Sequence, residues 1–377
     1  MSLSKDEFYR FMRPTRAFID TNALRANLRR IRELAPGRSV TAILKANAYG
    51  HGQLVVARAL DDADAFGVAF LEEALELRNG GIEKPIVLLE GFFGAHELPF
   101  LERYDLWTVV HNENQVEALE RAHPNRPIRV WLKIDTGLHR LGFAPEQVEA
   151  MHRRLSACKS VEQPVNWITH FACADEPDNP RTAEQLALFN RLTAGKPGLR
   201  SLCNSAGTLC WPEAHGDWIR PGVMLYGLSP LAQKVGSDHG LQPVMTLESQ
   251  IIAVRHVVAG ERIGYGGCYV VPADTVIGTI AIGYGDGYPR HAPTGTPVLV
   301  NGREVPVVGR VSMDMITVDL GAEPVAGVGD RAVLWGRGLP VERVAALAET
   351  IGYELLCGVT RRVPSYTPDF EFDDGCG

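Results

Sequence analysis

The sequence lacks several patterns that would assign it to a class of proteins at once. Its seven cysteines include no CxxC pair, and an odd number without that spacing predicts neither a disulfide framework nor a zinc site. No apolar run is long enough to cross a bilayer, and the polar N-terminus has no apolar signal-peptide stretch. Thiols that remain free are typical of a reducing compartment. We therefore expect a cytoplasmic protein without a metal site.

Positive charge is also scarce. The sequence has 38 Lys and Arg against 45 Asp and Glu, which gives a formal net charge of −7. Because anionic partners need a basic surface, we expect neither a nucleic acid nor an anionic membrane as a partner. A chain of 377 residues is long enough for two or three domains, or for one barrel with an appendage.

From residue 40 onward, apolar strands alternate with amphipathic helices. The predicted strands are 40–44, 65–70, 85–90, 106–111, 128–135, 165–171, 199–204 and 218–226. Strands this apolar need cover on both faces, so eight such repeats favour a (β/α)8 barrel of the TIM type over an open sheet. A doubly wound fold is the alternative, but no GxGxxG motif follows the first strand.

The sequence pattern changes after about residue 241, where strands follow one another across Gly, Pro and Asn turns. We expect a mainly antiparallel β domain over 241–370, after a barrel over 16–240. Asn301-Gly302 predicts a hairpin, and one helix is expected near 341–350. The strand near residues 14–20 is left as a candidate member of the β domain. The tail 371–377 is expected to be disordered.

Side chains suited to chemistry follow the predicted barrel strands. They are Lys45, Lys133, Arg140, His170, Asn204, Ser205 and Arg220. Barrels carry their active sites at this end of the strands. A lysine held there with a desolvated stem has a lowered pKa, and its amine can form a Schiff base. Taken alone, such a lysine more often only reaches solvent, and a serine like Ser205 is more often a helix cap.

The motif around Lys45 decides between these interpretations. Residues 45–52 read KANAYGHG and resemble the pyridoxal-phosphate (PLP) lysine motif of bacterial alanine racemases, most closely the proteobacterial type. The resemblance extends from about Arg16 to Tyr366. It implies a PLP-dependent enzyme that interconverts L- and D-alanine, the substrate, by two-base proton transfer. Lys45 is implied to form the internal aldimine with PLP and to act as one base. Tyr265 of the partner subunit is implied as the other, which requires a head-to-tail homodimer with shared sites.

The resemblance also implies roles for other residues. The implied cofactor-binding residues are Tyr49, His170, Asn204, Ser205, Arg220, Gly222, Val223 and Tyr353. The implied substrate-binding residues are Arg140, Met313, Asp314 and Lys133, a lysine that is carbamylated in many members. The implied access corridor to the site is formed by Asp175, Tyr284, Arg290 and Arg310, with Asp286 nearby. Gly285 stands where alanine is common, and we expect that exchange to be neutral.

Three other functions remain open at this point. A broad-specificity amino-acid racemase would share the scaffold, and only the corridor or kinetics would separate it. A non-catalytic PLP-binding protein is disfavoured because such proteins lack the β domain and its Tyr265. A decarboxylase of the same two-domain fold is disfavoured by KANAYGHG, and by Arg220 where those enzymes place an acidic partner.

Overall fold

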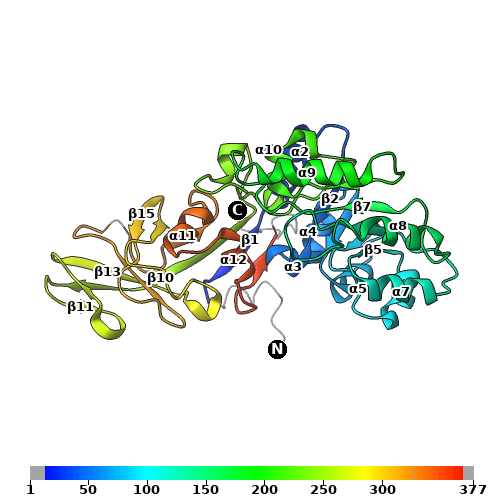
Figure 1. Cartoon of the computed structure of the whole chain (residues 1–377). Helices are drawn as coiled ribbons and strands as arrows, with labels where there is room; N and C mark the ends of the chain where they lie inside the picture. The colour runs from blue at the N-terminus through cyan, green and yellow to red at the C-terminus, as the bar shows by residue number, and fades with distance from the viewer. Residues whose placement is uncertain (1–12, 325, 368–377) are drawn as a thin grey trace, which may run out of the picture. The chain divides into compact units, whose positions relative to one another are not determined.

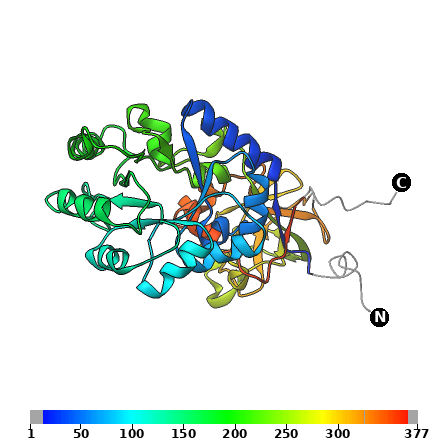
Figure 2. The same ribbon diagram turned by 90° about the vertical axis from the view of Figure 1, so that its right-hand side faces the viewer.

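The computed structural model describes residues 13–324 and 326–367. These residues form two compact units, each of which is described by itself. Residues 24–241 form the barrel unit, and residues 13–23 with 242–367 form the β unit. Figures 1 and 2 show both in two views. The predicted tail 371–377 lies outside the described residues.

Eight parallel strands close a barrel in the barrel unit. In chain order they are β2 (Ser39–Ile43), β3 (Ala65–Val68), β4 (Ile86–Leu88), β5 (Leu106–Val110), β6 (Val130–Lys133), β7 (Asn166–Ile168), β8 (Arg200–Ser201) and β9 (Trp218–Ile219). The barrel closes where Ser39 of β2 pairs with Trp218 of β9. The predicted (β/α)8 barrel is therefore confirmed, and the doubly wound alternative is wrong.

Helices alternate with these strands and surround them (Figure 2). They are α2 (Thr21–Leu34), α3 (Lys45–Tyr49), α4 (Gln53–Ala59), α5 (Leu71–Asn79), α6 (Leu98–Arg103), α7 (Glu113–Arg121), α8 (Val148–Ala157), α9 (Arg181–Thr193) and α10 (Ser205–Cys210), with 3-10 turns η1 (Ala95–Glu97), η2 (Pro212–Ala214), η3 (Val223–Tyr226) and η4 (Gly236–His239). Asn112 caps α7 by accepting from the Gln115 N–H at 3.0 Å, as short polar side chains do.

The barrel interior is a packed core. Trp107 and Trp131 both meet Trp218 edge to face, at centroid distances of 5.7 and 6.3 Å. Val87 and Ile168 belong to the same buried cluster. Because the interior is filled, a ligand site on this barrel must lie at an end of the strands.

The last barrel strand is shorter than predicted. β9 ends at Ile219, and η3 occupies residues 223–226, where the sequence predicted more strand. Pro221 has no N–H to continue a ladder, and Gly222 turns the chain with φ −113° and ψ −88°. The backbone of Gly222 and Val223 therefore lies at the strand end.

The β unit is mainly antiparallel, as predicted. Its strands are β1 (Arg16–Ile19), β10 (Met245–Val257), β11 (Arg262–Ile263), β12 (Tyr269–Val270), β13 (Thr275–Ile280), β14 (Pro297–Val300), β15 (Arg303–Pro306), β16 (Ile316–Asp319), β17 (Arg331–Trp335) and β18 (Ser365–Tyr366). The long β10 pairs with β1, β13 and β17. Asn301 and Gly302, with φ of 46° and 78°, form the predicted hairpin turn between β14 and β15.

Short helices complete the β unit. They are η5 (Tyr265–Gly267), η6 (Tyr284–Asp286), α11 (Val341–Leu347) and α12 (Gly352–Cys357). The start of α2 is capped by Asp20, whose Oδ1 accepts from the Ala23 N–H at 3.0 Å. No helix in the described part of the chain is long and apolar enough to cross a membrane.

Candidate active site

Five predicted site residues lie at or just after the C-terminal ends of barrel strands. Lys45 comes two residues after β2, Lys133 ends β6, and Arg220 directly follows β9. His170 and Asn204 follow β7 and β8. Because the strands are parallel, these ends meet at one end of the barrel.

The electrostatics of this end show that its cations are close together. Burial, followed by the positive charges of Arg220, Arg140 and Lys45, lowers the pKa of Lys133 from 10.5 to about 8. Among the larger influences only Glu90 opposes the shift. In a cluster of positive charges, each cation disfavours the charged form of the others, and a bound anion relieves that repulsion. This end of the barrel is therefore prepared for anionic groups.

Arg220 is buried and its donors are fixed. Nη1 donates to Ser201 Oγ at 2.7 Å, and Nη2 donates to the Thr169 carbonyl at 2.7 Å and the Leu202 carbonyl at 3.2 Å. Burial lowers the pKa of Arg220 to about 10, so the guanidinium stays charged at neutral pH.

His170 is held neutral beside Arg220. Its Nδ1 lies 3.3 Å from Arg220 Nη2, a nitrogen that can only donate. Burial and then the charge of Arg220 keep the pKa of His170 well below its usual value. Asn204 Nδ2 lies 3.5 Å from the Nε2 atom. His170 thus orients the arginine without adding a charge.

Hydroxyl groups and backbone amides meet at Gly222. Ser205 begins α10, and its Oγ accepts from the N–H groups of Gly222 at 2.9 Å and Met224 at 3.4 Å. A Cβ on Gly222 would lie 2.6 Å from the hydroxyl oxygen of Tyr49. Only glycine therefore lets the Tyr49 hydroxyl reach this point. Hydroxyl donors and amides at the start of a helical turn, here Val223, are a donor set that suits a phosphate.

Two predicted residues of the barrel unit are exposed. The charge of Arg140 reaches Lys133 and His170, whose pKa values it lowers. Asp175 lies near the end of α10, where burial and then its charge raise the pKa of Cys210. The structure therefore brings Arg140 to the cation cluster and leaves Asp175 outside it.

The other predicted residues belong to the β unit. They are Tyr265 in η5, Tyr284 in η6, Arg290, Arg310, Met313, Asp314 and Tyr353 in α12. Two backbone bonds fasten the loop that carries Met313: the Tyr284 N–H donates to the Ser312 carbonyl at 3.0 Å, and the Gly285 N–H donates to the Met313 carbonyl at 2.9 Å. The corridor residue Tyr284 and the substrate-binding loop are therefore parts of one local structure.

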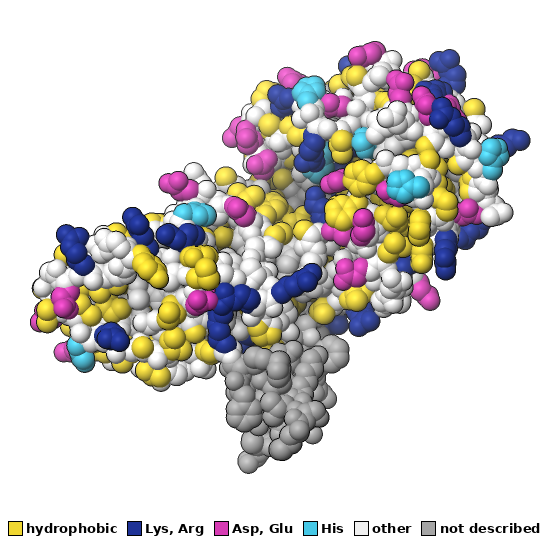
Figure 3. All heavy atoms as spheres, turned by 90° about the horizontal axis from the view of Figure 1, so that it is seen from below, with side chains coloured by type: hydrophobic (Ala, Val, Ile, Leu, Met, Phe, Trp, Pro, Cys, Tyr) yellow, Lys and Arg dark blue, Asp and Glu magenta, His cyan; other side chains and the backbone are white. Residues whose placement is uncertain are grey.

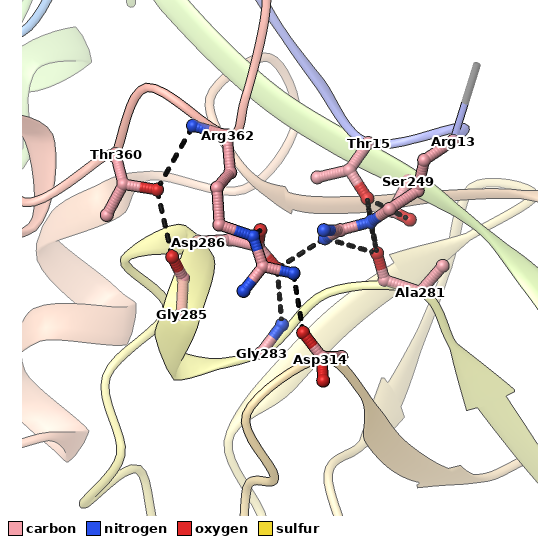
Figure 4. Close-up of polar contacts among 10 residues, drawn as sticks. All are labelled: Arg13, Thr15, Ser249, Ala281, Gly283, Gly285, Asp286, Asp314, Thr360 and Arg362. Atoms are coloured by element: carbon pink, nitrogen blue, oxygen red, sulfur yellow. Dashed lines mark hydrogen bonds and ion pairs between the residues drawn. The ribbon is translucent and has the colours of Figure 1, made fainter.

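A buried carboxylate organises this local structure (Figure 4). Asp286 is fully buried, accepts from the Gly283 N–H at 2.9 Å, and pairs with Arg13. Arg362 Nε lies 3.5 Å from Asp286 Oδ1, and Arg362 Nη2 donates to Asp314. Asp314 is thus oriented by an ion-pair chain that starts in the core of the β unit.

The lack of a side chain at Gly285 leaves room for the Arg362 guanidinium in that ion-pair chain. A Cβ at position 285 would lie 2.2 Å from Arg362 Nη1 and 3.1 Å from the Met313 carbonyl oxygen. An alanine would require only the guanidinium, the far end of a flexible and half-exposed side chain, to move, so the neutrality of the exchange stays a prediction. Sequence reasoning gave Arg362 and Arg13 no role, because nothing local links them to Asp286.

Several large side chains near these residues are exposed. The exposed fractions are 70% for Tyr265, 52% for Met313, 60% for Ile351 and 39% for Tyr284. Figure 3 shows hydrophobic side chains at the surface of both units, between charged ones. Three of these side chains, Tyr265, Met313 and Tyr284, are predicted site residues, and they are therefore accessible at the surface of the β unit.

Comparison with known proteins gives the family. Residues 19–230 match the family described as "Alanine racemase, N-terminal domain", and residues 244–367 match "Alanine racemase, C-terminal domain". The chain belongs to the alanine racemase family. The biosynthetic alanine racemase of Escherichia coli K12 is 58% identical over 353 residues, which are 93% of this chain and 98% of that one.

Solved structures of alanine racemases agree. The biosynthetic alanine racemase of Pseudomonas aeruginosa superimposes with a TM-score of 0.92 at 48% identity, covering 94% of this chain and 99% of that one. The alanine racemase of E. faecalis gives a TM-score of 0.87 at 38% identity, covering 95% and 99%. The similarity therefore includes both units.

Alanine racemases depend on PLP, and the residues of the barrel unit fit that cofactor. Ser205, the Gly222 amide and the Tyr49 hydroxyl lie together at this strand end, and they are groups that could donate to the cofactor phosphate. Lys45 directly follows the strand β2 and Leu44. Among the described residues, no group of three or more His, Cys, Asp or Glu side chains is placed to hold a metal ion.

Proposed function

We propose that the protein interconverts L- and D-alanine by moving a proton between two bases, Lys45 and Tyr265 of the partner subunit. The reaction itself follows from family membership, since alanine racemases are isomerases acting on alanine. The assignment of residues is the proposal. It is carried by one observation: Lys45 stands at the C-terminal end of the barrel within the cation cluster of Lys133, Arg140 and Arg220.

Each of the two bases transfers a proton at one face of the alanine Cα. When bound, PLP supplies an electron sink that makes the Cα proton of alanine removable. Racemisation needs a proton taken from one face of Cα and returned to the other. The Lys45 amine serves one face, and the hydroxyl of Tyr265 serves the other as general acid or base. Neither group then has to cross the substrate plane.

The other residues bind and orient. Tyr49, Ser205, Gly222, Val223 and Tyr353 would hold the cofactor phosphate. Arg220, supported by His170 and Asn204, would donate to the ring nitrogen, because an arginine cannot accept a proton there.

A second group receives the substrate. Arg140 would pair with the alanine carboxylate through a charge-assisted fork, with Lys133 beside it. The Met313–Asp314 backbone would lie along the same carboxylate. Asp175, Tyr284, Arg290 and Arg310 would narrow the access corridor and favour a small side chain.

The homodimer is proposed on the exposure of Tyr265. That side chain belongs to the β domain, 241–370, whereas Lys45 belongs to the barrel domain, 16–240. A general base needs a site shielded from water, yet Tyr265 is 70% exposed. Covering by a second copy, arranged head to tail, would shield two equivalent sites.

A cytoplasmic location is proposed on the cysteines. Six described cysteines are free thiols: Cys158, Cys173, Cys203, Cys210, Cys268 and Cys357. Thiols persist in this form in a reducing compartment.

The direct test is a turnover assay on the purified protein with PLP. We expect L-alanine to give D-alanine, and the reverse, with other amino acids racemised much more slowly. Serine and the branched amino acids should be run alongside. Equal rates across that panel would instead support a broad-specificity racemase.

Arg220→Glu should change which reaction occurs. A carboxylate would favour a protonated ring nitrogen and a stronger electron sink. We expect racemisation to fall by about tenfold or more and pyruvate to appear from alanine, as the amino group passes to the cofactor. Pyruvate and D-alanine are measured together. Arg220→Lys, which keeps a cation, should form no pyruvate. If Arg220→Glu only lowers stability or PLP affinity, Arg220 has a structural role.

Lys133 should work as a carbamate. Its pKa near 8 gives the neutral amine that adds CO2, and the product anion would be stabilised among the neighbouring cations. Lys133→Ala should lower kcat about ten- to a hundredfold, the loss of a charged hydrogen-bond partner, and acetate should restore part of it. Chloride at the same ionic strength is the control. Equal recovery with both salts would contradict an anionic Lys133.

A further inference from the structure

The four residues after Lys45 adopt a left-handed backbone conformation that was not predicted from the sequence. Ala46, Asn47, Ala48 and Tyr49 have φ of 53°, 52°, 52° and 53°, which makes α3 one turn of left-handed helix. L side chains disfavour this region because Cβ crowds the next carbonyl, and it is usually visited by single residues. Four in succession persist only where the surroundings hold them.

His51 contacts the carbonyls at the end of this turn. Its Nδ1 lies 3.0 Å from the Ala48 carbonyl oxygen and 2.9 Å from the Tyr49 carbonyl oxygen. Both partners are acceptors, so Nδ1 carries the proton and donates to both. The side chain is completely buried, and Nε2 has no hydrogen-bond partner within residues 13–324 and 326–367. Burial lowers the pKa of His51 to about 4, so the ring is neutral at neutral pH.

Tyr226 connects His51 with the end of β2. The ring of Tyr226 stacks on Tyr49 at 4.8 Å and lies 4.6 Å from the ring of His51. The Tyr226 hydroxyl donates to the Ile43 carbonyl at 2.7 Å. The turn is therefore packed against a ring that is itself anchored two residues before Lys45.

The beginning of the turn is held independently. Glu73 Oε1 accepts from the Ala46 N–H at 2.7 Å, and Oε2 accepts from the Ala69 N–H at 2.7 Å. The carbonyls of the turn accept from the backbone N–H groups of residues 50–52, and the His51 ring is the side chain that adds a donor at its end. This end carries Tyr49, whose hydroxyl reaches Gly222.

We propose that His51 is a positioning residue that keeps the turn left-handed and thereby fixes Lys45 and the Tyr49 hydroxyl for the cofactor. This inference rests on the proposed function, in which Lys45 and Tyr49 bind PLP. The Nδ1 donor, rather than the ring, is the part of His51 that acts. Without this donor, the turn would relax toward negative φ, and the Tyr49 hydroxyl would move away from Gly222.

Two substitutions separate the donor from the ring. His51→Phe keeps a ring against Tyr226 and loses the donor. His51→Asn keeps an amide N–H near the Nδ1 position and loses the ring. The readouts are the PLP dissociation constant of the resolved enzyme, from the visible absorbance of lysine-bound cofactor, and kcat and KM for L-alanine. His51→Phe should weaken PLP binding about tenfold or more, the cost of two lost carbonyl bonds. His51→Asn should weaken it much less.

A glycine provides a second test. Ala46 is exposed, and Ala46→Gly keeps the N–H that Glu73 accepts while removing the steric cost of positive φ. If His51 opposes strain, His51→Phe combined with Ala46→Gly should recover a large part of the lost PLP affinity. If His51 merely fills the core, glycine should add flexibility and worsen binding.

His215→Phe is the matched control. His215 is buried and its Nε2 bonds one carbonyl, that of Thr208, at 3.0 Å. His215→Phe should lower the melting temperature without the tenfold loss of PLP affinity. An equal loss would assign the effect to general loosening and overturn the inference, as would wild-type PLP binding by His51→Phe. A wild-type protein with no lysine-bound PLP would instead contradict the proposed function.

Discussion

Lys45→Ala should abolish racemisation and remove the visible absorbance of lysine-bound PLP. A general base contributes about 10²–10⁴ in rate, and Lys45 is also proposed to be the covalent anchor, so we expect the loss to reach the upper end of that range or exceed it. The measurement is the absorbance spectrum of the purified variant together with D-alanine formation. The melting temperature should change little, because Lys45 is only half-buried and is not part of the buried core of the barrel unit.

Lys45→Arg is the matched control for charge. Arginine keeps the positive charge within the cation cluster but stays protonated, so it is neither nucleophile nor base. It should be as inactive as Lys45→Ala. A variant that turned over at the wild-type rate, without an added amine, would show that the lysine assignment is wrong.

Tyr265→Phe should reduce turnover about 10²–10⁴-fold, the contribution of one general acid or base. The change removes a single hydroxyl from a side chain that is 70% exposed, so neither folding nor the visible absorbance of bound PLP should change. Removal of the proton from L-alanine should be affected most. Tyr269→Phe, four residues further along the same unit, should keep most of the activity.

Mixing subunits tests whether Lys45 and Tyr265 come from different chains. A heterodimer of Lys45→Ala and Tyr265→Ala subunits has one site with both bases and one with neither. Once the subunits exchange, about half of the wild-type activity per heterodimer should return. A purified heterodimer that stays as inactive as its parents would contradict the shared site.

The fold was predictable from the sequence because its signals are local and repeated. Eight apolar strands separated by helices have few alternatives to a closed parallel barrel. Boundaries were less predictable, since they depend on single residues. Pro221 ends β9 where apolar residues continue to Tyr226, and Asp20 caps α2 although Thr21 and Asn22 are equally suitable polar residues.

The site was predictable where chemistry follows a strand end, as at Lys45 and Arg220. It was not predictable where no residue type signals the backbone conformation, or where interacting residues are far apart in the sequence. No glycine at positions 46–49 signals positive φ, although Gly50 and Gly52 follow. Likewise, Arg362 and Asp314 are 48 positions apart, and only the folded β unit brings them together.

The central claim is that two bases serve opposite faces of alanine, and proton labelling tests it most directly. Protiated L-alanine is converted in D2O, and the Cα of the first D-alanine formed is analysed by NMR or mass spectrometry. Two bases predict deuterium at Cα of the product, because the proton removed by Tyr265 is not the one that Lys45 returns. D-alanine that retains the original Cα proton would require a single base to carry it across, and would contradict the account.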